Sequence, residues 1–215
     1  MAELGRRQPA RRRTYRHGDL RRALIDAGLE LAREGGPDAV VLREVTRRVG
    51  VVPNAAYRHF ADHRALLQAV SRAALGRAAL AMEEEIAAVP SFGDVRTIAR
   101  ARVRAIGSGY LRFAAAEPGW FRTAFTVGGD LARVGDRDGA GESGLTPFQL
   151  LGRALDDLQA AGLLLPERRD GAGFAAWSAV HGLAMLILEG PLQVLDPAAR
   201  RAAARRVLEM VEGGL

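Results

Sequence analysis

Apolar residues recur at three- and four-residue steps along most of this 215-residue chain, and no stretch sustains the apolar–polar alternation of a strand. Leu20, Leu24 and Leu31 show the spacing near the start of the chain, and Ile106 and Phe113 show it near the middle. Such spacing gathers the apolar side chains on one face of a helix. The sequence therefore predicts an all-α fold with about nine helices.

Glycine and proline residues mark where the predicted helices begin and end. The expected helices cover residues 19–34, 42–48, 53–59, 63–88, 94–116, 119–125, 147–161, 171–189 and 197–212. Six glycines with scattered charges between residues 127 and 144 predict a mobile loop.

The net charge of +6 comes entirely from the first third of the chain. Residues 1–64 hold 14 arginines against 8 acidic residues, whereas residues 65–215 hold 17 of each, and the chain contains no lysine. A positive excess confined to one segment indicates a polyanionic partner. Residues 1–16 carry six arginines and few apolar side chains, so we expect them to form a disordered basic arm.

The composition argues against several other classes of protein. There is no cysteine, which removes disulfides, thiolate zinc sites and cysteine nucleophiles, and with only four histidines we expect no metal site and no cofactor. The longest apolar run is the six residues Leu183–Leu188, whereas a membrane span needs about 20. We therefore expect a cytoplasmic protein that does not engage a membrane.

Residues 39–60 contain two short helical segments joined by a glycine turn. Leu42 and Val45 lie on the apolar face of the first segment, Gly50 ends it, and Pro53 suits the first turn of the second segment. This arrangement is typical of a helix-turn-helix, in which the second helix enters the major groove of DNA.

The same block resembles the DNA-binding domain of TetR/AcrR-family transcriptional regulators. The resemblance is carried by Leu42-Arg43-Glu44-Val45, Val49-Gly50-Val51 and above all Pro53-Asn54-Ala55-Ala56-Tyr57-Arg58-His59-Phe60, and it continues through Asp62, Leu66 and Leu67. Tyr15–Leu20 and Trp177–Leu183 resemble a subgroup whose C-terminal domain carries a Trp…His-Gly (WHG-type) signature. The resemblance implies a basic arm (1–16), a DNA-binding domain (17–64) and an effector-binding and dimerisation domain (65–215).

The resemblance also implies which residues contact DNA. Tyr57 and His59 would contact phosphates, whereas Asn54 and Arg58 would face the groove, and the arm would follow the backbone or enter the minor groove. Phe60 is the exception and is expected to pack into the core. The complete predicted set is Arg12, Arg13, Arg43, Pro53, Asn54, Ala55, Tyr57, Arg58, His59 and His63.

Four positions depart from the usual family pattern. Val41 and Val52 stand where a hydroxyl residue commonly caps a helix, Thr46 replaces a small alanine, and His63 replaces a lysine that meets a phosphate. A lost cap costs about 0.5–2 kcal/mol. The departures indicate either weaker DNA contacts that the arginine arm offsets, which we favour, or an altered or lost DNA function.

Five of the twelve aromatic residues fall between positions 110 and 125. The resemblance implies an effector pocket between the helices here, and an apolar pocket with few polar groups suits a lipophilic effector. Taken singly, each aromatic is better explained as core packing. The candidate ligand residues are Tyr110, Phe113, Trp120, Phe121, Phe125, Phe148, Trp177 and His181.

Two short motifs invite an enzymatic interpretation, and both are better explained by helices. Residues 171–176 contain G-x-G-x-x-A, but no predicted strand precedes them as a dinucleotide-binding unit requires. Ser178 and His181 share one helix without an evident acidic partner, and no G-x-S-x-G is present. We therefore expect no catalytic residues and no enzymatic activity.

The last two long predicted helices, at 171–189 and 197–212, each carry an apolar face. The resemblance implies that these helices form a four-helix interface in a homodimer, which would match an operator with two half-sites. The function implied is a ligand-responsive repressor of transcription, in which the helix at 63–88 relays effector binding to the DNA-binding domain. The alternative is a helical ligand-binding or scaffolding protein that has lost sequence-specific DNA recognition.

Overall fold

The computed structural model describes residues 17–126 and 137–214. The described residues form ten α-helices and three short 3-10 helices, and they contain no strand. The α-helices are α1 (His17–Gly35), α2 (Leu42–Val49), α3 (Pro53–Ala56), α4 (His63–Ala87), α5 (Val95–Ala116), α6 (Pro118–Thr126), α7 (Pro147–Ala160), α8 (Pro166–Arg169), α9 (Ala172–Leu188) and α10 (Pro197–Gly214). The all-α prediction is confirmed. The predicted arm at 1–16 lies outside the described residues.

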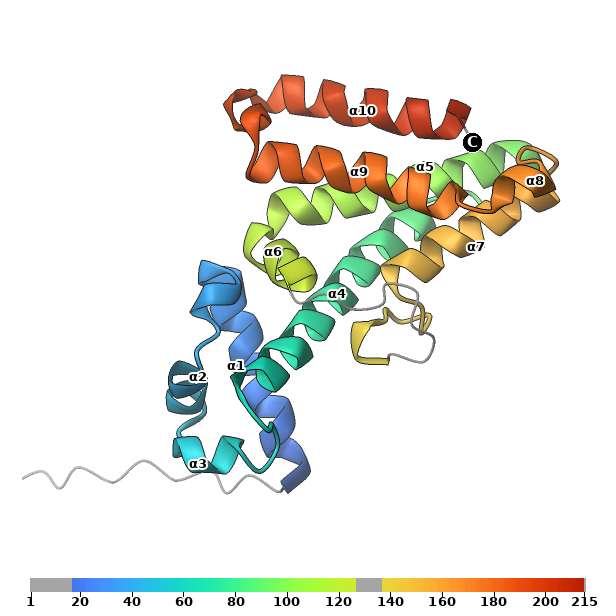
Figure 1. Cartoon of the computed structure of the whole chain (residues 1–215). Coiled ribbons are helices and arrows are strands. Elements are labelled where there is room, and N and C mark those ends of the chain that lie inside the picture. The colour runs from blue at the N-terminus through green and yellow to red at the C-terminus, as the bar shows by residue number, and fades with distance from the viewer. Residues whose placement is uncertain (1–16, 127–136, 215) are drawn as a thin grey trace, which may run out of the picture.

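Two hydrophobic clusters lie at opposite ends of the molecule (Figure 1). The N-terminal cluster is built by α1, α2, α3 and the first half of α4 with Ala124 of α6, and the C-terminal cluster by the second half of α4 with α5, α6, α7, α9 and α10. Within α4, Leu66 and Val70 belong to the first cluster, whereas Ala78 and Met82 belong to the second. This helix of 25 residues, about 38 Å long, is therefore a shared element of both cores.

Helix α6 provides a second connection between the two clusters. The indole N–H of Trp120 donates to the carbonyl oxygen of Leu29 in α1 at 2.7 Å, and Arg33 forms an ion pair with Glu117 at 2.6 Å. A β-carbon on Gly119 would overlap backbone carbonyl oxygens of α1, so the two helices approach each other at their backbones. The link between the domains was predicted to run through the helix at 63–88 alone, and this clamp was not predicted.

The second helix of the helix-turn-helix is shorter than predicted. It ends at Ala56, because the amide N–H groups of His59 and Phe60 both bond to the carbonyl oxygen of Ala56 and turn the chain. Tyr57 to His59 therefore lie in a turn rather than in the helix predicted to reach residue 59. The four-residue helix α8 was not predicted.

The predicted mobile loop is only partly described, since residues 127–136 lie outside the described ranges. Its second half is anchored to α4, contrary to the prediction. The Glu83 carboxylate accepts hydrogen bonds from the backbone N–H of Glu142 at 2.8 Å and of Ser143 at 3.0 Å, and Gly76 lies against the carbonyl oxygen of Ala140. The spacing of the glycines could not predict that the Glu83 carboxylate would accept hydrogen bonds from the backbone of Glu142 and Ser143.

Candidate DNA interface and effector site

Helices α2 and α3 are held against the N-terminal core by the apolar faces that the sequence predicts. Val45, Ala56 and Phe60 are buried, which confirms that Phe60 packs into the core. Thr46, the residue that replaces a small alanine, is buried as well, and its hydroxyl donates to the carbonyl oxygen of Arg43 at 3.0 Å. The buried hydroxyl of Thr46 therefore has a hydrogen-bond partner within its own helix.

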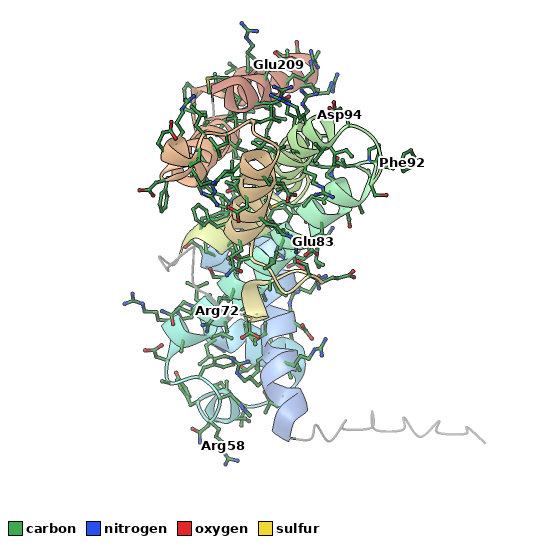
Figure 2. The ribbon with its side chains drawn as sticks, turned by 90° about the vertical axis from the view of Figure 1, so that its right-hand side faces the viewer. Arg58, Arg72, Glu83, Phe92, Asp94 and Glu209 are labelled. Atoms are coloured by element: carbon green, nitrogen blue, oxygen red, sulfur yellow. The ribbon has the colours of Figure 1, made fainter. Side chains whose placement is uncertain are left out.

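The outer surface of α2, α3 and the turn after α3 carries polar side chains that make no bond to another described residue. Arg43, Asn54, Tyr57 and Arg58 are exposed, and none of them forms an ion pair or side-chain hydrogen bond with another described residue. Figure 2 shows Arg58 at the end of the molecule opposite Glu209. These side chains are free to meet a partner approaching that end.

The other two arginines of α2 differ in this respect. Arg47 makes two hydrogen bonds to the Glu44 carboxylate, and Arg48 bonds Glu34 at 2.6 Å. Their charges are compensated within the protein. Of the three arginines in α2, Arg43 alone offers an uncompensated guanidinium to a polyanion.

Three further predicted contacts, Pro53, Ala55 and His59, lie on the same surface, with Pro53 exposed and the other two half-buried. His63 begins α4, and its Nε2 lies 2.6 Å from the carbonyl oxygen of Val40. Because a carbonyl only accepts, Nε2 must carry the proton of this bond. Only Nδ1 of His63 is then left for the predicted phosphate contact. The predicted contacts Arg12 and Arg13 lie outside the described residues.

Val41 and Val52 occupy the N-cap positions of α2 and α3 without a side-chain hydrogen bond, and both are exposed. The backbone of Val52 is extended, with φ −74° and ψ 147°, which is the conformation a capping serine adopts. We expect Val52→Ser to raise the free energy of unfolding by about 0.5–1 kcal/mol, because its hydroxyl can accept an amide N–H of the first turn. Urea unfolding checks this, with Val52→Ala as the matched control. Equal stabilities of the Ser and Ala variants would contradict it.

Five of the predicted ligand residues gather into one cluster, called here the aromatic cluster: Tyr110, Phe121, Phe125, Trp177 and His181. The ring centroids of Tyr110 and Trp177 are 4.9 Å apart, and those of Phe125 and His181 are 5.0 Å apart. Phe121 is fully buried between them. Aromatic pairs at such distances and tilted angles stabilise beyond the area they bury.

A hydrogen bond inside the cluster fixes the protonation of His181. The Tyr110 hydroxyl lies 2.7 Å from Nδ1 of His181, and burial raises the pKa of Tyr110 far above its usual value, so the phenol keeps its proton. If Nδ1 carried a hydrogen, the buried phenol proton would have no acceptor among the described residues. We therefore assign the phenol as donor, which leaves a proton on Nε2 of His181.

Burial lowers the pKa of His181, so the folded protein holds this ring neutral. Below the unfolded-state pKa of about 6.5, the unfolded chain binds a proton that the folded protein does not. We therefore expect the free energy of unfolding to fall as the pH drops below about 7, until the folded pKa is reached. Denaturation at pH 7.5 and 5.5 checks this. The loss should be smaller in His181→Gln, and an equal loss in both proteins would contradict the assignment.

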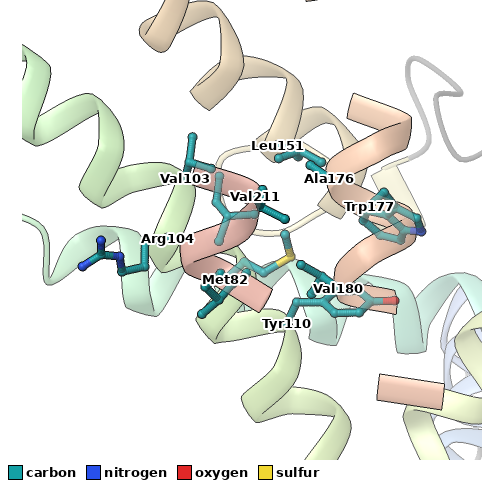
Figure 3. A pocket seen from close by; sticks show the side chains of 12 residues that line it. Met82, Val103, Arg104, Tyr110, Leu151, Ala176, Trp177, Val180 and Val211 are labelled. Atoms are coloured by element: carbon teal, nitrogen blue, oxygen red, sulfur yellow. The ribbon is translucent and has the colours of Figure 1, made fainter. Parts of the chain in front are cut away.

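The apolar centre of the C-terminal domain contains a small cavity, called here the core cavity (Figure 3). Met82, Tyr110, Trp177 and Val180 border it, while the Arg104 side chain points away from it. Its volume is about 30 Å³, which is room for about one water molecule. In this conformation the core cavity is too small for an organic effector.

A larger cavity, called here the junction cavity, lies between the two domains and measures about 480 Å³. Phe121, Phe125 and His181 form its inner wall, and Pro37 and Asp38, from the segment after α1, form the opposite wall. A volume of this size is typical of small-molecule sites. That residues 35, 37 and 38 line a cavity together with residues of the aromatic cluster was not predicted from the sequence.

The remaining predicted ligand residues do not belong to this cluster. Phe113 is buried in the core beside Phe121, and Phe148 packs against Phe174 and Trp177 near the surface. The indole of Trp120 faces α1, where it serves the clamp between the domains. None of these three lines the core cavity or the junction cavity, and their assignment to an effector site stays a prediction.

Neither a metal site nor a membrane span is found in the parts of the chain that the structure describes. No group of three or more potential ligand side chains gathers there to hold an ion. No helix within 17–126 or 137–214 combines the length and the apolar character needed to cross a bilayer.

Comparison with known families decides the class of the protein. Residues 24–70 match the family described as bacterial regulatory proteins, tetR family, and residues 103–211 match the tetracyclin repressor-like C-terminal domain. The second match alone covers half of the chain. The chain belongs to the TetR family. This TetR-family protein is accordingly a DNA-binding transcriptional regulator and not an enzyme.

Solved structures share the fold of this TetR-family protein. A protein of unknown function from Rhodococcus sp. RHA1 is 25% identical, with a TM-score of 0.70 over 95% of this chain and 99% of its own. RolR in complex with resorcinol is 18% identical, with a TM-score of 0.61 over 90% of this chain and 88% of its own. FadR from Bacillus subtilis in complex with stearoyl-CoA is 16% identical, with the same TM-score over 90% and 98%. No match is found among curated proteins.

Proposed function

We propose that this protein represses transcription as a homodimer that binds a palindromic operator and is released by a small effector. The observation that carries the proposal is the set of exposed, uncompensated groups on α2, α3 and the turn after α3, namely Arg43, Asn54, Tyr57 and Arg58. Arginine pairs with guanine, and asparagine pairs with adenine, through two hydrogen bonds in the major groove. The arm at 1–16, with Arg12 and Arg13, adds contacts to the backbone or the minor groove in this proposal.

The proposed dimer forms through α9 and α10. Phe174 and Leu186 on α9 and Met210 on α10 are large apolar side chains exposed to solvent in the single chain. Space is open around Gly182, where a second helix can approach closely. If these faces pair about a twofold axis, the dimer presents two recognition helices to the two half-sites of a palindrome.

Three finer assignments are part of the proposal. The domain boundaries remain those predicted from the sequence, 17–64 for DNA binding and 65–215 for effector binding and dimerisation. We also propose membership of the WHG-type subgroup, on the basis of Trp177, His181 and Gly182, and a cytoplasmic location.

We propose the junction cavity as the effector site. An effector with an aromatic or apolar body would pack against Phe125, and an acceptor atom on it would receive the Nε2 proton of His181. RolR binds resorcinol and FadR from Bacillus subtilis binds stearoyl-CoA, so two proteins of this fold bind organic ligands. The Rhodococcus protein, the relative with the higher identity, has no stated ligand.

The clamp between α6 and α1 supports a route from this cavity to DNA. An effector that displaces α6 acts on α1 directly through the Trp120–Leu29 and Glu117–Arg33 contacts, and on α3 through the shared core. The effector must bind the DNA-incompetent conformation more tightly, since only differential affinity shifts an equilibrium. Coupling free energies of about 1–3 kcal/mol are typical.

The proposal is tested by selecting bound duplexes from a random DNA pool at near-physiological salt. We expect an enriched palindrome whose half-sites lie about one helical turn, 34–36 Å, apart. Protein that is folded and dimeric but enriches no sequence would reject the proposal in favour of a ligand-binding or scaffolding protein without sequence-specific recognition.

A further inference from the structure

A groove of about 400 Å³ opens between α5, α9 and α10, separate from the core and junction cavities. The three helices pack tightly at one level, where a β-carbon on Gly107 would overlap the Leu208 side chain. Beyond that level the facing residues are small, namely Ala114, Ala184 and Ala204, and the helices leave space between them. The groove therefore exists because the three helices face one another with side chains too small to fill the space between them.

The floor of the groove is aliphatic. Besides the alanines, Leu111, Ile187, Leu188 and Leu208 line it, and no aromatic ring does. On α10, Leu208 in the groove lies about 200° around the helix from Met210, which belongs to the surface proposed for dimerisation.

Every charged side chain that lines the groove is an arginine: Arg112, Arg200, Arg201 and Arg205. Glu84 and Glu85 neutralise Arg112, at 2.8 and 3.0 Å. The other three arginines, all on α10, have little compensation. Arg200 donates only to neutral carbonyl oxygens, and Arg205 forms no ion pair with a described residue.

Arg201 has one acidic neighbour, Asp196, whose carboxylate already accepts the backbone N–H of Ala199 at 2.8 Å. Among the described residues, Asp196 is therefore the one acidic side chain shown near these three arginines, and its carboxylate is already engaged in capping α10. The α10 edge of the groove therefore carries a surplus of positive charge beside an aliphatic floor.

We propose that this groove is a second ligand site, which binds an anionic amphiphile consisting of an unbranched aliphatic chain with a terminal carboxylate. The chain lies on the alanine and leucine floor, where its methylene groups leave water. The carboxylate meets Arg201 and Arg205, whose planar guanidinium groups match its two oxygens. The site is independent of the proposed effector site and of DNA binding.

Isothermal titration of the full-length protein with laurate, below its micelle concentration, tests the proposal. We expect one laurate bound per chain, with a dissociation constant in the micromolar range. Butyrate, which has the head group without the chain, should not bind detectably. Dodecanol, which has the chain without the charge, should bind at least tenfold more weakly. Absence of laurate binding would overturn the proposal.

Variants locate the site. The surface double variant Arg201→Gln and Arg205→Gln should weaken laurate binding at least tenfold, and Ala204→Trp should fill the groove and abolish it. Arg100→Gln is the matched control, since Arg100 is an exposed arginine on α5 that does not line the groove, and it should bind like the parent. Circular dichroism establishes whether each variant folds. If Ala204→Trp does not fold, the double variant Arg201→Gln and Arg205→Gln tests the location of the site by itself.

Ala176→Trp fills the core cavity and separates the two sites. If it abolishes laurate binding while the groove variants bind normally, laurate occupies the core and the proposal is wrong. Equal weakening by Arg100→Gln and by the groove double variant would also overturn it, because binding would then reflect net charge alone.

Discussion

Replacing Arg43 and Arg58 together by alanine will weaken operator binding by about 2–6 kcal/mol, because each arginine is expected to supply one base contact of about 1–3 kcal/mol. That corresponds to a loss of roughly thirtyfold or more. Folding and dimerisation should persist, since both side chains are exposed and make no bond to another described residue. Fluorescence anisotropy with a labelled operator duplex measures the loss.

The matched control is the double variant Arg47→Ala and Arg48→Ala, which removes the same charge from α2. These arginines are already bound to Glu44 and Glu34, so their loss should change operator affinity only a few-fold. Equal losses in the two double variants would show that binding follows net charge rather than the predicted contacts. The assignment of Arg43 and Arg58 would then be wrong.

The largest expected effect on stability follows from Phe121→Ala. Phe121 is 0% exposed and contacts the rings of Tyr110, Phe125 and His181. Removing a fully buried phenylalanine ring costs about 3–5 kcal/mol, through lost burial and the cavity left behind. Urea unfolding at a fixed protein concentration measures the free energy, since the stability of a dimer depends on concentration.

Phe92→Ala is the matched control, because Phe92 lies in the loop between α4 and α5 and is 84% exposed. Its loss should change the free energy of unfolding by no more than about 0.5 kcal/mol. If Phe121→Ala also cost less than about 1 kcal/mol, the aromatic cluster would not be the packed centre described above. The cluster could not then position His181 toward the junction cavity.

The fold and the helix-turn-helix could be predicted because they depend on local patterns. The spacing of Leu24 and Leu31, the break at Gly50 and the proline at position 53 each act within a few residues of sequence. The same patterns predicted the buried position of Val45, whereas the buried position of Phe60 was implied by the family resemblance. The end of the recognition helix was missed, because one carbonyl, that of Ala56, accepts two amides and turns the chain early.

The division of the aromatic residues between core, clamp and cavity could not be predicted. Trp120 and Phe121 are neighbours in sequence, yet one ring faces α1 and the other fills the C-terminal core. Their separation depends on how α6 crosses α1, which Gly119 permits through a close backbone approach. Contacts between residues about 90 positions apart leave no periodic signal in the sequence.

Hydrogen bonds between side chains and partners that are distant along the chain could not be predicted from the sequence either. The protonation of His181 depends on Tyr110, 71 positions away, and Nε2 of His63 is engaged by a carbonyl 23 positions away. Residue types suggested phosphate or ligand contacts for both histidines. Their partners decide which ring nitrogen is left to make such contacts.

The most direct test of the central claim is the ratio of affinities for the selected palindrome and for a scrambled duplex of equal length, measured at about 0.15 M salt. Specific regulators bind their operators about 10³-fold or more tightly than unrelated DNA. We predict a ratio of at least that size, with one dimer bound per palindrome. A ratio near one, from folded dimeric protein, would show that the arginine-rich end binds DNA only as a polyanion and would contradict the account.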